Sequence, residues 1–239
     1  MNIKEKTLFS LKFRNGLLFG VIINVLLVVY GELLVPTAIT ASSNGVSGFI
    51  TSLSILLVYA GVSFYCIKPT ERVFHNILQY SLIFGLIIGS IYFLEIILEY
   101  ILLPSGQLNI IMGKIEFGLA LFLFFLSGLW SVVATQKYFS SILTSFWCGI
   151  VASLIWLCAV LLVFYLFHGT SQQITVLKAE GDYEDFKRSG MTDFNAFIVQ
   201  DFWGAGFFHL LLSPIIASIL GSIGGLFGFL FLKLFKHNR

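Results

Sequence analysis

Apolar residues in this chain form long uninterrupted runs instead of the mixed pattern of a soluble protein. A helix needs about 20 apolar residues to cross about 30 Å of hydrocarbon, and runs of this length occur six times. They do not alternate with a period of two, as strands of a membrane barrel would. Because backbone amides in lipid must be hydrogen-bonded internally, we predict an all-α integral membrane protein, a bundle of six transmembrane helices. The predicted spans, within a single membrane domain of residues 1–239, are 17–35, 48–67, 77–103, 115–134, 141–167 and 207–235.

The composition supports this assignment and excludes several classes of protein. Hydrophobic residues make up 58% of the chain and charged residues 11%, so apolar side chains must also cover the outside of the fold. The formal net charge of +2 is too small and too dispersed to indicate nucleic-acid binding, which leaves the lipid bilayer as the expected surroundings. No Walker loop, dinucleotide fingerprint, HExxH or cysteine-histidine metal spacing occurs, and the sequence predicts neither a cofactor nor a metal site.

Basic residues flank the predicted spans unequally. Ten of them lie on one side, namely Lys4, Lys6, Lys12, Arg14, Lys68, Arg72, Lys137, Lys233, Lys236 and Arg239. The other side has Lys114, Lys178, Lys187 and Arg188, three of them in one long loop. Short loops on the cytoplasmic side of a membrane are rich in Lys and Arg. We therefore predict a multi-pass protein of the cell (plasma or inner) membrane with both termini in the cytoplasm. The first apolar run exceeds the roughly 7 to 15 residues of a signal-peptide core, and we expect it to be retained.

The only sizeable segment outside the predicted spans is 168–205, on the predicted outer side. Its second half predicts an amphipathic interfacial helix that begins after a Thr192 cap. The apolar stripe of that helix is Phe194, Phe197, Ile198 and Phe202. Trp203 is expected at the membrane interface, and Gly204 and Gly206 at a bend into the last span. This helix is either a lid or docking surface or a connector that covers the rim of the bundle.

Four carboxylates, predicted near one level of the outer half of the membrane, form a candidate site for a ligand or cation: Glu32, Glu95, Glu99 and Glu116. Glu116 is expected to open the fourth helix. An ionised carboxylate in hydrocarbon costs on the order of 2.5 to 3.5 kcal/mol, so each needs water, a proton or a partner such as Lys114. The alternative is that the long third span carries its acidic end into the headgroup layer.

Small residues recur on one face of the sixth predicted span, at Ser213, Ala217, Gly221 and Gly225, with Gly224 and Gly228 on the adjacent row. This spacing lets another helix backbone approach closely. The predicted partner is either another helix of this chain, or a membrane-protein partner or second copy of the chain in a homo-oligomer.

A short motif suggests a third kind of site. Gly45–Gly48 reads GxSG, and together with His209 it resembles the serine and histidine of intramembrane serine proteases, which implies Ser47 as nucleophile and His209 as base. Ser47 lies two helices earlier than the serine of rhomboid-type enzymes.

Three functional hypotheses follow. The first is a non-enzymatic accessory or assembly component of a membrane complex. The second is a transport component for a cation or cationic small solute that uses the outer carboxylates, and the third is an intramembrane hydrolase. A cavity lined by the carboxylates would favour transport, an exposed glycine face would favour assembly, and contact between Ser47 and His209 would favour hydrolysis.

Overall fold

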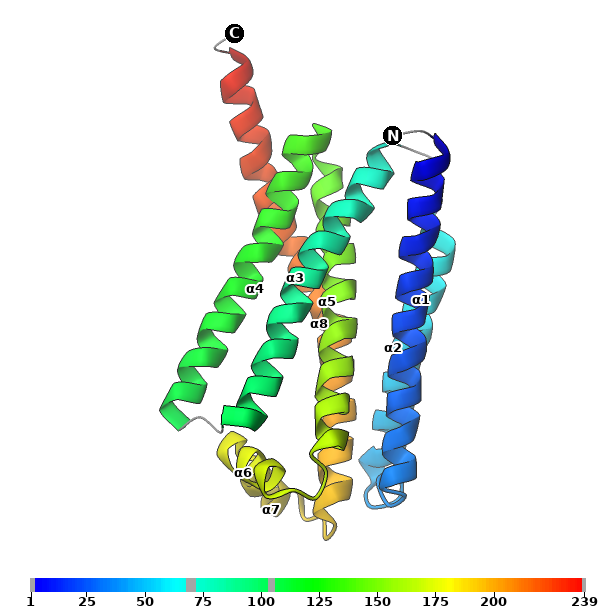
Figure 1. The fold of residues 1–239 in the computed structure, drawn as a ribbon, viewed down its shortest axis with the longest axis vertical. Coiled ribbons are helices and arrows are strands. Elements are labelled where there is room, and N and C mark those ends of the chain that lie inside the picture. The colour runs from blue at the N-terminus through cyan, green and yellow to red at the C-terminus, as the bar shows by residue number, and fades with distance from the viewer. Residues whose placement is uncertain (1–2, 68–71, 103–105, 238–239) are drawn as a thin grey trace.

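The computed structural model describes residues 3–67, 72–102 and 106–237, and this part of the chain is helical without strands (Figure 1). Six helices are long and apolar enough to cross a membrane. In chain order these are α1 (Ile3–Leu34), α2 (Ser43–Cys66), α3 (Arg72–Leu102), α4 (Gly106–Thr135), α5 (Phe139–Leu166) and α8 (Phe194–His237). Two short helices, α6 (Ser171–Glu180) and α7 (Asp182–Ser189), lie between α5 and α8.

The predicted all-α bundle of six spans is therefore confirmed. Each predicted span lies inside one long helix or extends past its end by one residue. Leu103, at the end of the third predicted span, lies outside the described residues, as do the basic residues Lys68 and Arg239. Both chain termini lie at one end of the bundle, called here the terminal end, and α6 and α7 lie at the other, called the α6–α7 end (Figure 1). The side of the membrane that each end faces remains a prediction from the basic residues.

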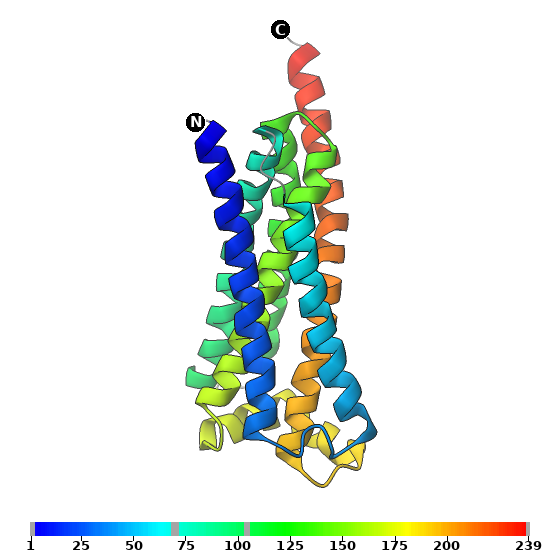
Figure 2. The ribbon, with the colours of Figure 1, turned by 90° about the vertical axis from the view of Figure 1, so that its right-hand side faces the viewer.

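Helix α5 occupies the centre of the bundle and packs against α1, α3, α4 and α8 (Figures 1 and 2). Its many small residues, including several Ser, allow neighbouring helices to come close, and its hydroxyl groups bond across the interfaces. The hydroxyl of Ser145 lies 2.7 Å from that of Ser127, and the hydroxyl of Thr144 lies 2.7 Å from that of Ser131. Ser81 donates to the carbonyl of Thr144 at 2.9 Å. These bonds fix α3 and α4 against the first half of α5.

The small-residue face of α8 packs on α4 and α5 of the same chain. A methyl group at Gly221 would collide with Ser145, one at Gly225 with Ser141, and one at Gly224 with the backbone oxygen of Phe125. At Gly228 it would lie 2.9 Å from the backbone oxygen of Leu129, and Ala217 is fully buried. The face is thus occupied within one chain.

The start of α8 differs from the prediction in three ways. Asp193, not Thr192, caps the helix, and its carboxylate accepts the backbone N–H of Ala196 at 3.1 Å. The helix then runs unbroken through Gly204 and Gly206, because both lie in ordinary helical conformation. The predicted interfacial helix is therefore the first part of a 44-residue helix about 66 Å long.

The apolar stripe at the start of α8 packs into the bundle. Ile198 is buried, and Phe194, Phe197 and Phe202 contact the main core while remaining partly exposed. Trp203, predicted at the membrane interface, is fully buried in the bundle. Its ring lies edge-on to that of Phe49 of α2. The stripe therefore joins α8 to its neighbours instead of lying along the membrane surface.

Hydrogen bonds connect α8 to two earlier parts of the chain, the α1–α2 connection and α2 itself. The bonded residues are more than 150 positions apart in the sequence. Thr37 donates to Asp193 at 2.5 Å, and Gln200 bonds both to Ser42 at 2.6 Å and to the carbonyl of Ala38 at 2.6 Å. The Thr37 hydrogen bond, with help from backbone N–H groups of α8, holds the pKa of Asp193 below its ordinary value.

Further along α2, two side chains bond to the backbone of α8. Ser52 donates to the carbonyl of Trp203 at 2.7 Å, and Tyr59 donates to the carbonyl of Leu210. These side chains attach the α1–α2 pair to the last helix.

Candidate functional site

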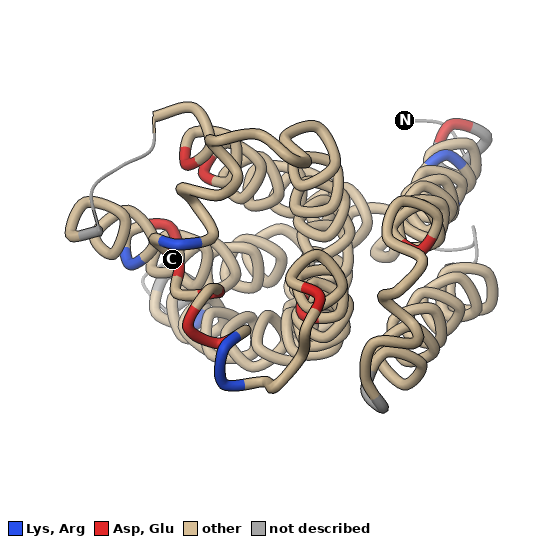
Figure 3. Tube along the Cα trace, turned by 90° about the horizontal axis from the view of Figure 1, so that it is seen from below, with Lys and Arg blue, Asp and Glu red and all other residues tan. Residues whose placement is uncertain are grey.

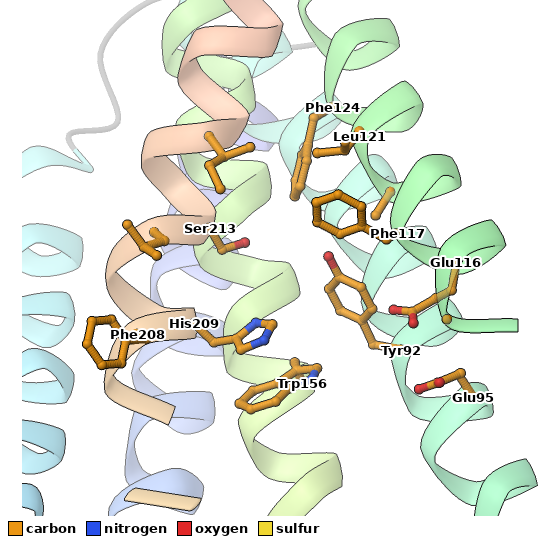
Figure 4. A pocket seen from close by; sticks show the side chains of 14 residues that line it. Tyr92, Glu95, Glu116, Phe117, Leu121, Phe124, Trp156, Phe208, His209 and Ser213 are labelled. Carbon is orange, nitrogen blue, oxygen red and sulfur yellow. The ribbon is translucent and has the colours of Figure 1, made fainter. Parts of the chain in front are cut away.

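A cavity of about 480 Å³ lies among α3, α4, α5 and α8, in the half of the bundle nearer the α6–α7 end (Figure 4). Two of its lining residues are acidic, Glu95 of α3 and Glu116 of α4. The remaining wall is largely aromatic and aliphatic, with His209 and Ser213 of α8 as further polar groups. The cavity has the size of a small-molecule site, roughly 300 to 1,000 Å³, and the usual apolar lining with few polar groups.

The two carboxylates come from neighbouring helices and occupy the same wall (Figure 4). Glu116 lies ten residues inside α4, which begins at Gly106, so it does not open the helix as predicted. At 1.5 Å per residue it is about 15 Å from that helix start, deep enough to meet Glu95. The two carboxylates are close enough for mutual Coulombic repulsion. A positively charged group between them would relieve that repulsion.

Aromatic side chains line much of the cavity, and those of His209 and Trp156 lie across it from the carboxylates (Figure 4). The ring of His209 stacks on Trp156 of α5, with centroids 3.7 Å apart and planes 12° from parallel. Tyr92 lies one turn before Glu95 on the same face of α3, and Phe117 and Phe124 of α4 also line the space (Figure 4). The faces of Trp, Tyr and Phe rings attract cations.

A second pair of carboxylates lies one turn further toward the α6–α7 end. Asn109 donates its side-chain amide to Glu99 at 2.8 Å and also to Glu180, the last residue of α6. Glu180 is exposed and lies within Coulombic range of Glu95. Glu99 is likewise within range of Glu95. Carboxylates therefore extend from the cavity to the surface formed by α6.

Asp182, the first residue of α7, continues this acidic surface, and Figure 3 shows Asp and Glu positions spread over the α6–α7 end. Partial burial, with smaller contributions from the nearby carboxylates of Asp201, Glu180 and Asp185, raises its pKa to about 7. Its charge is thus sensitive to pH near neutrality.

The other predicted site residues lie elsewhere. Glu32 lies at the end of α1, close to the backbone of Ile39, and does not line the cavity. Lys114 is exposed, and the ion pairs found among residues 3–67, 72–102 and 106–237 are both internal to α7, so it has no carboxylate partner in this part of the chain. The candidate site thus brings together Glu95, Glu116 and, one turn away, Glu99, but not Glu32.

Ser47 and His209 are placed on different surfaces. Gly48, next to Ser47, lies against Gln200 and Trp203 of α8. His209 lies six residues, or about 9 Å, beyond Trp203 and stacks on α5 at the cavity. No contact between the serine and the histidine results.

Several residues of the candidate site, in the cavity and beside it, were not predicted from the sequence. Tyr92 could have been identified from its position one turn before Glu95. Trp156, Asn109 and Glu180 had no local signal, because their roles depend on how the helices are arranged.

No protein-family model, curated protein or solved structure matches this chain. The chemistry of the cavity is therefore the basis for assigning a function.

Proposed function

We propose that this six-helix membrane protein binds a small organic cation in the cavity and serves as a membrane transport component for it. The observation that supports this most directly is the placement of Glu95 and Glu116 opposite the stacked rings of His209 and Trp156. A carboxylate in hydrocarbon needs water, a proton or a partner, and an ammonium group is such a partner. An aromatic face adds about 2 kcal/mol when the cation is desolvated.

The shape and lining of the cavity favour an organic cation over a bare metal ion. In the part of the chain that the structure describes, no group of three or more His, Cys, Asp or Glu side chains could hold a metal ion. A volume of about 480 Å³ far exceeds the space that a dehydrated ion needs. A molecule with an ammonium group and an apolar body uses both the carboxylates and the aromatic wall.

The acidic surface beyond the cavity supports a route for the ligand. Glu99, Asn109 and Glu180 connect the carboxylates of the cavity with Asp182 on the exposed end of the molecule. Negative charges along a route raise the local concentration of a cation and its rate of entry. If both termini are cytoplasmic, as the basic flanks predict, this route opens on the outer side of the cell membrane.

A role in assembly through α8 has less support than the sequence suggested. The small residues that would bind another membrane protein are covered by α4 and α5. The carboxylates of the cavity, in contrast, lie at a depth where an ionisable residue is costly and commonly marks a functional site.

Binding of tetraethylammonium, phenethylammonium and butylammonium to the purified protein tests the proposal, with rubidium as an inorganic comparison. We expect saturable binding of at least one organic cation and none of rubidium. Glu95→Gln and Glu116→Gln should each weaken affinity by roughly 10- to 100-fold, the range expected for a bond to a charged group. Glu32→Gln is the matched control, because this carboxylate lies outside the cavity.

A second pair of variants tests the location. Gly113 lines the cavity and Gly118 does not, yet neither has another atom within 4 Å of an added Cβ. Gly113→Leu should therefore abolish binding by filling the cavity, whereas Gly118→Leu should leave it unchanged. The proposal is wrong if none of the organic cations binds saturably, or if both glutamine variants bind as well as the wild type.

A further inference from the structure

A second cavity, of about 440 Å³, lies between α1, α3 and α5, on the opposite side of α5 from the first. It is an apolar groove, and among the described residues that line it Lys12 of α1 is the charged one. Val151 and Leu154 of α5 form its buried floor, and Leu82 and Leu86 of α3 form one wall. Figure 1 shows α1 and α3 on either side of α5.

We propose that this groove holds one acyl chain of an anionic phospholipid, whose phosphate pairs with Lys12. The proposal concerns a different surface from the organic-cation cavity and does not depend on it. Length is the first argument: the groove follows α1 from Phe9 to Gly20, eleven residues or about 16 Å. That is roughly half of the ~30 Å hydrocarbon layer, the depth that one leaflet provides for one chain.

Charge is the second argument. Lys12 is exposed and lies inside the apolar span that begins at Thr7, about 8 Å from its start. A lysine at this depth extends toward the headgroups, where lipid phosphates lie. Both ion pairs within residues 3–67, 72–102 and 106–237 are in α7, so no described carboxylate neutralises Lys12. Most of the Lys and Arg residues in the sequence flank the spans at the terminal end of the bundle, and clustered basic residues attract anionic lipids.

The construction of the groove is the third argument. Gly16 and Gly20 face it, and a methyl group on Gly16 would have no atom within 4 Å. One turn later, a methyl group on Gly20 would lie 3.6 Å from Leu154 of α5, and the side-chain amide of Asn24 donates to the Leu154 carbonyl at 3.0 Å. An acyl chain in the groove would thus lie between α1 and α3 and contact α5.

Native mass spectrometry of the detergent-purified full chain tests the proposal, with phosphatidylglycerol and phosphatidylcholine of identical acyl chains added separately. We expect one phosphatidylglycerol to remain bound under conditions that remove phosphatidylcholine. Lys12→Gln should lower this preference about fivefold, the effect of one basic residue near an anionic headgroup. Lys137→Gln, a loss of the same charge outside the groove, should leave the preference unchanged.

Gly16→Leu should reduce bound phosphatidylglycerol roughly tenfold by filling the groove, as expected for overpacking. Gly61→Leu is the control, since Gly61 also has no atom within 4 Å of an added Cβ but lies on α2. If Gly16→Leu fails to fold, Leu86→Trp fills the groove from α3, with the exposed neighbour Ile87→Trp as its control.

Three results would overturn the proposal. The first is equal retention of phosphatidylglycerol and phosphatidylcholine by the wild type, and the second is unchanged retention in the groove-filling variants. The third is a dimer in gel filtration that Gly16→Leu dissociates, because a second copy of the chain would then occupy the groove.

Discussion

Two glycines of α8 are expected to respond in opposite directions to the same substitution. At Gly224 an added methyl group would collide with the backbone oxygen of Phe125 and lie 3.1 Å from the backbone nitrogen of Leu129. At Gly204 it would have no atom within 4 Å. Gly204→Ala therefore isolates the gain in helix propensity, whereas Gly224→Ala combines that gain with a steric penalty.

The magnitudes follow from these surroundings. Alanine is about 1 kcal/mol more favourable than glycine inside a helix, so Gly204→Ala should stabilise the protein by about this amount. Overpacking costs about 1 to 3 kcal/mol, and the upper end applies to Gly224→Ala because the backbone of α4 cannot rotate away. The net effect is a destabilisation of about 2 kcal/mol. At about 2 to 4 °C per kcal/mol, Tm should rise by about 2 to 4 °C for Gly204→Ala and fall by about 4 to 8 °C for Gly224→Ala.

Thermal unfolding of both variants and the wild type in one detergent, followed by far-ultraviolet circular dichroism, measures these shifts. The reasoning fails if Gly224→Ala melts at or above the wild-type temperature. It also fails if Gly204→Ala is destabilising, because that would indicate that the start of α8 requires a glycine bend.

Two further substitutions test other parts of the fold. The folded pKa of Asp182, about 7, lies above its ordinary value of 3.8, so the folded state holds an extra proton between these values and loses stability as pH rises through them. Asp182→Asn should remove this dependence. Above about pH 7 the variant should be more stable than the wild type, by well under the ~4 kcal/mol of the full pKa difference because solvent screens a partly exposed carboxyl, and below about pH 4 the two should be equally stable. Melting curves across that pH range measure the difference. Asn24→Leu removes the hydrogen bond from α1 to Leu154 and should cost about 0.6 to 1.7 kcal/mol. Faster hydrogen exchange along α1 would accompany that loss, and an unchanged exchange rate would contradict it.

The six spans could be predicted because the requirement that produces them is local. A run of apolar residues long enough for the hydrocarbon layer must be helical whatever surrounds it. The first turns of α8 were harder. Thr192 and Asp193 are both good cap residues, and Gly204 and Gly206 permit a bend but do not require one. Ile198 and Trp203 pack in the core where α8 continues as one helix, and the sequence alone does not show that contact.

The candidate site was predictable only in part. Glu95 and Glu99 share a face of α3 by their spacing, but the rotation of α4 that brings Glu116 to Glu95 is set by packing between helices. Glu180 comes from a segment 64 residues after Glu116, so its approach to Glu99 is a property of the fold alone. The central role of α5 did have a signal, because its serines and small residues recur along the helix as they do in α8.

The bonds of α2 to α8 have a consequence for biosynthesis. Helix α2 packs mainly against α1 and α8, and its Tyr59 hydroxyl bonds to the carbonyl of Leu210, 151 residues later. A ribosome adds about 5 to 20 residues per second, so the second helix emerges on the order of 10 s before its partner exists. During that interval its polar groups must be satisfied by water, by lipid headgroups or by the insertion machinery. A chain that stops before the last helix would leave the first two helices without the contacts that attach them to α8.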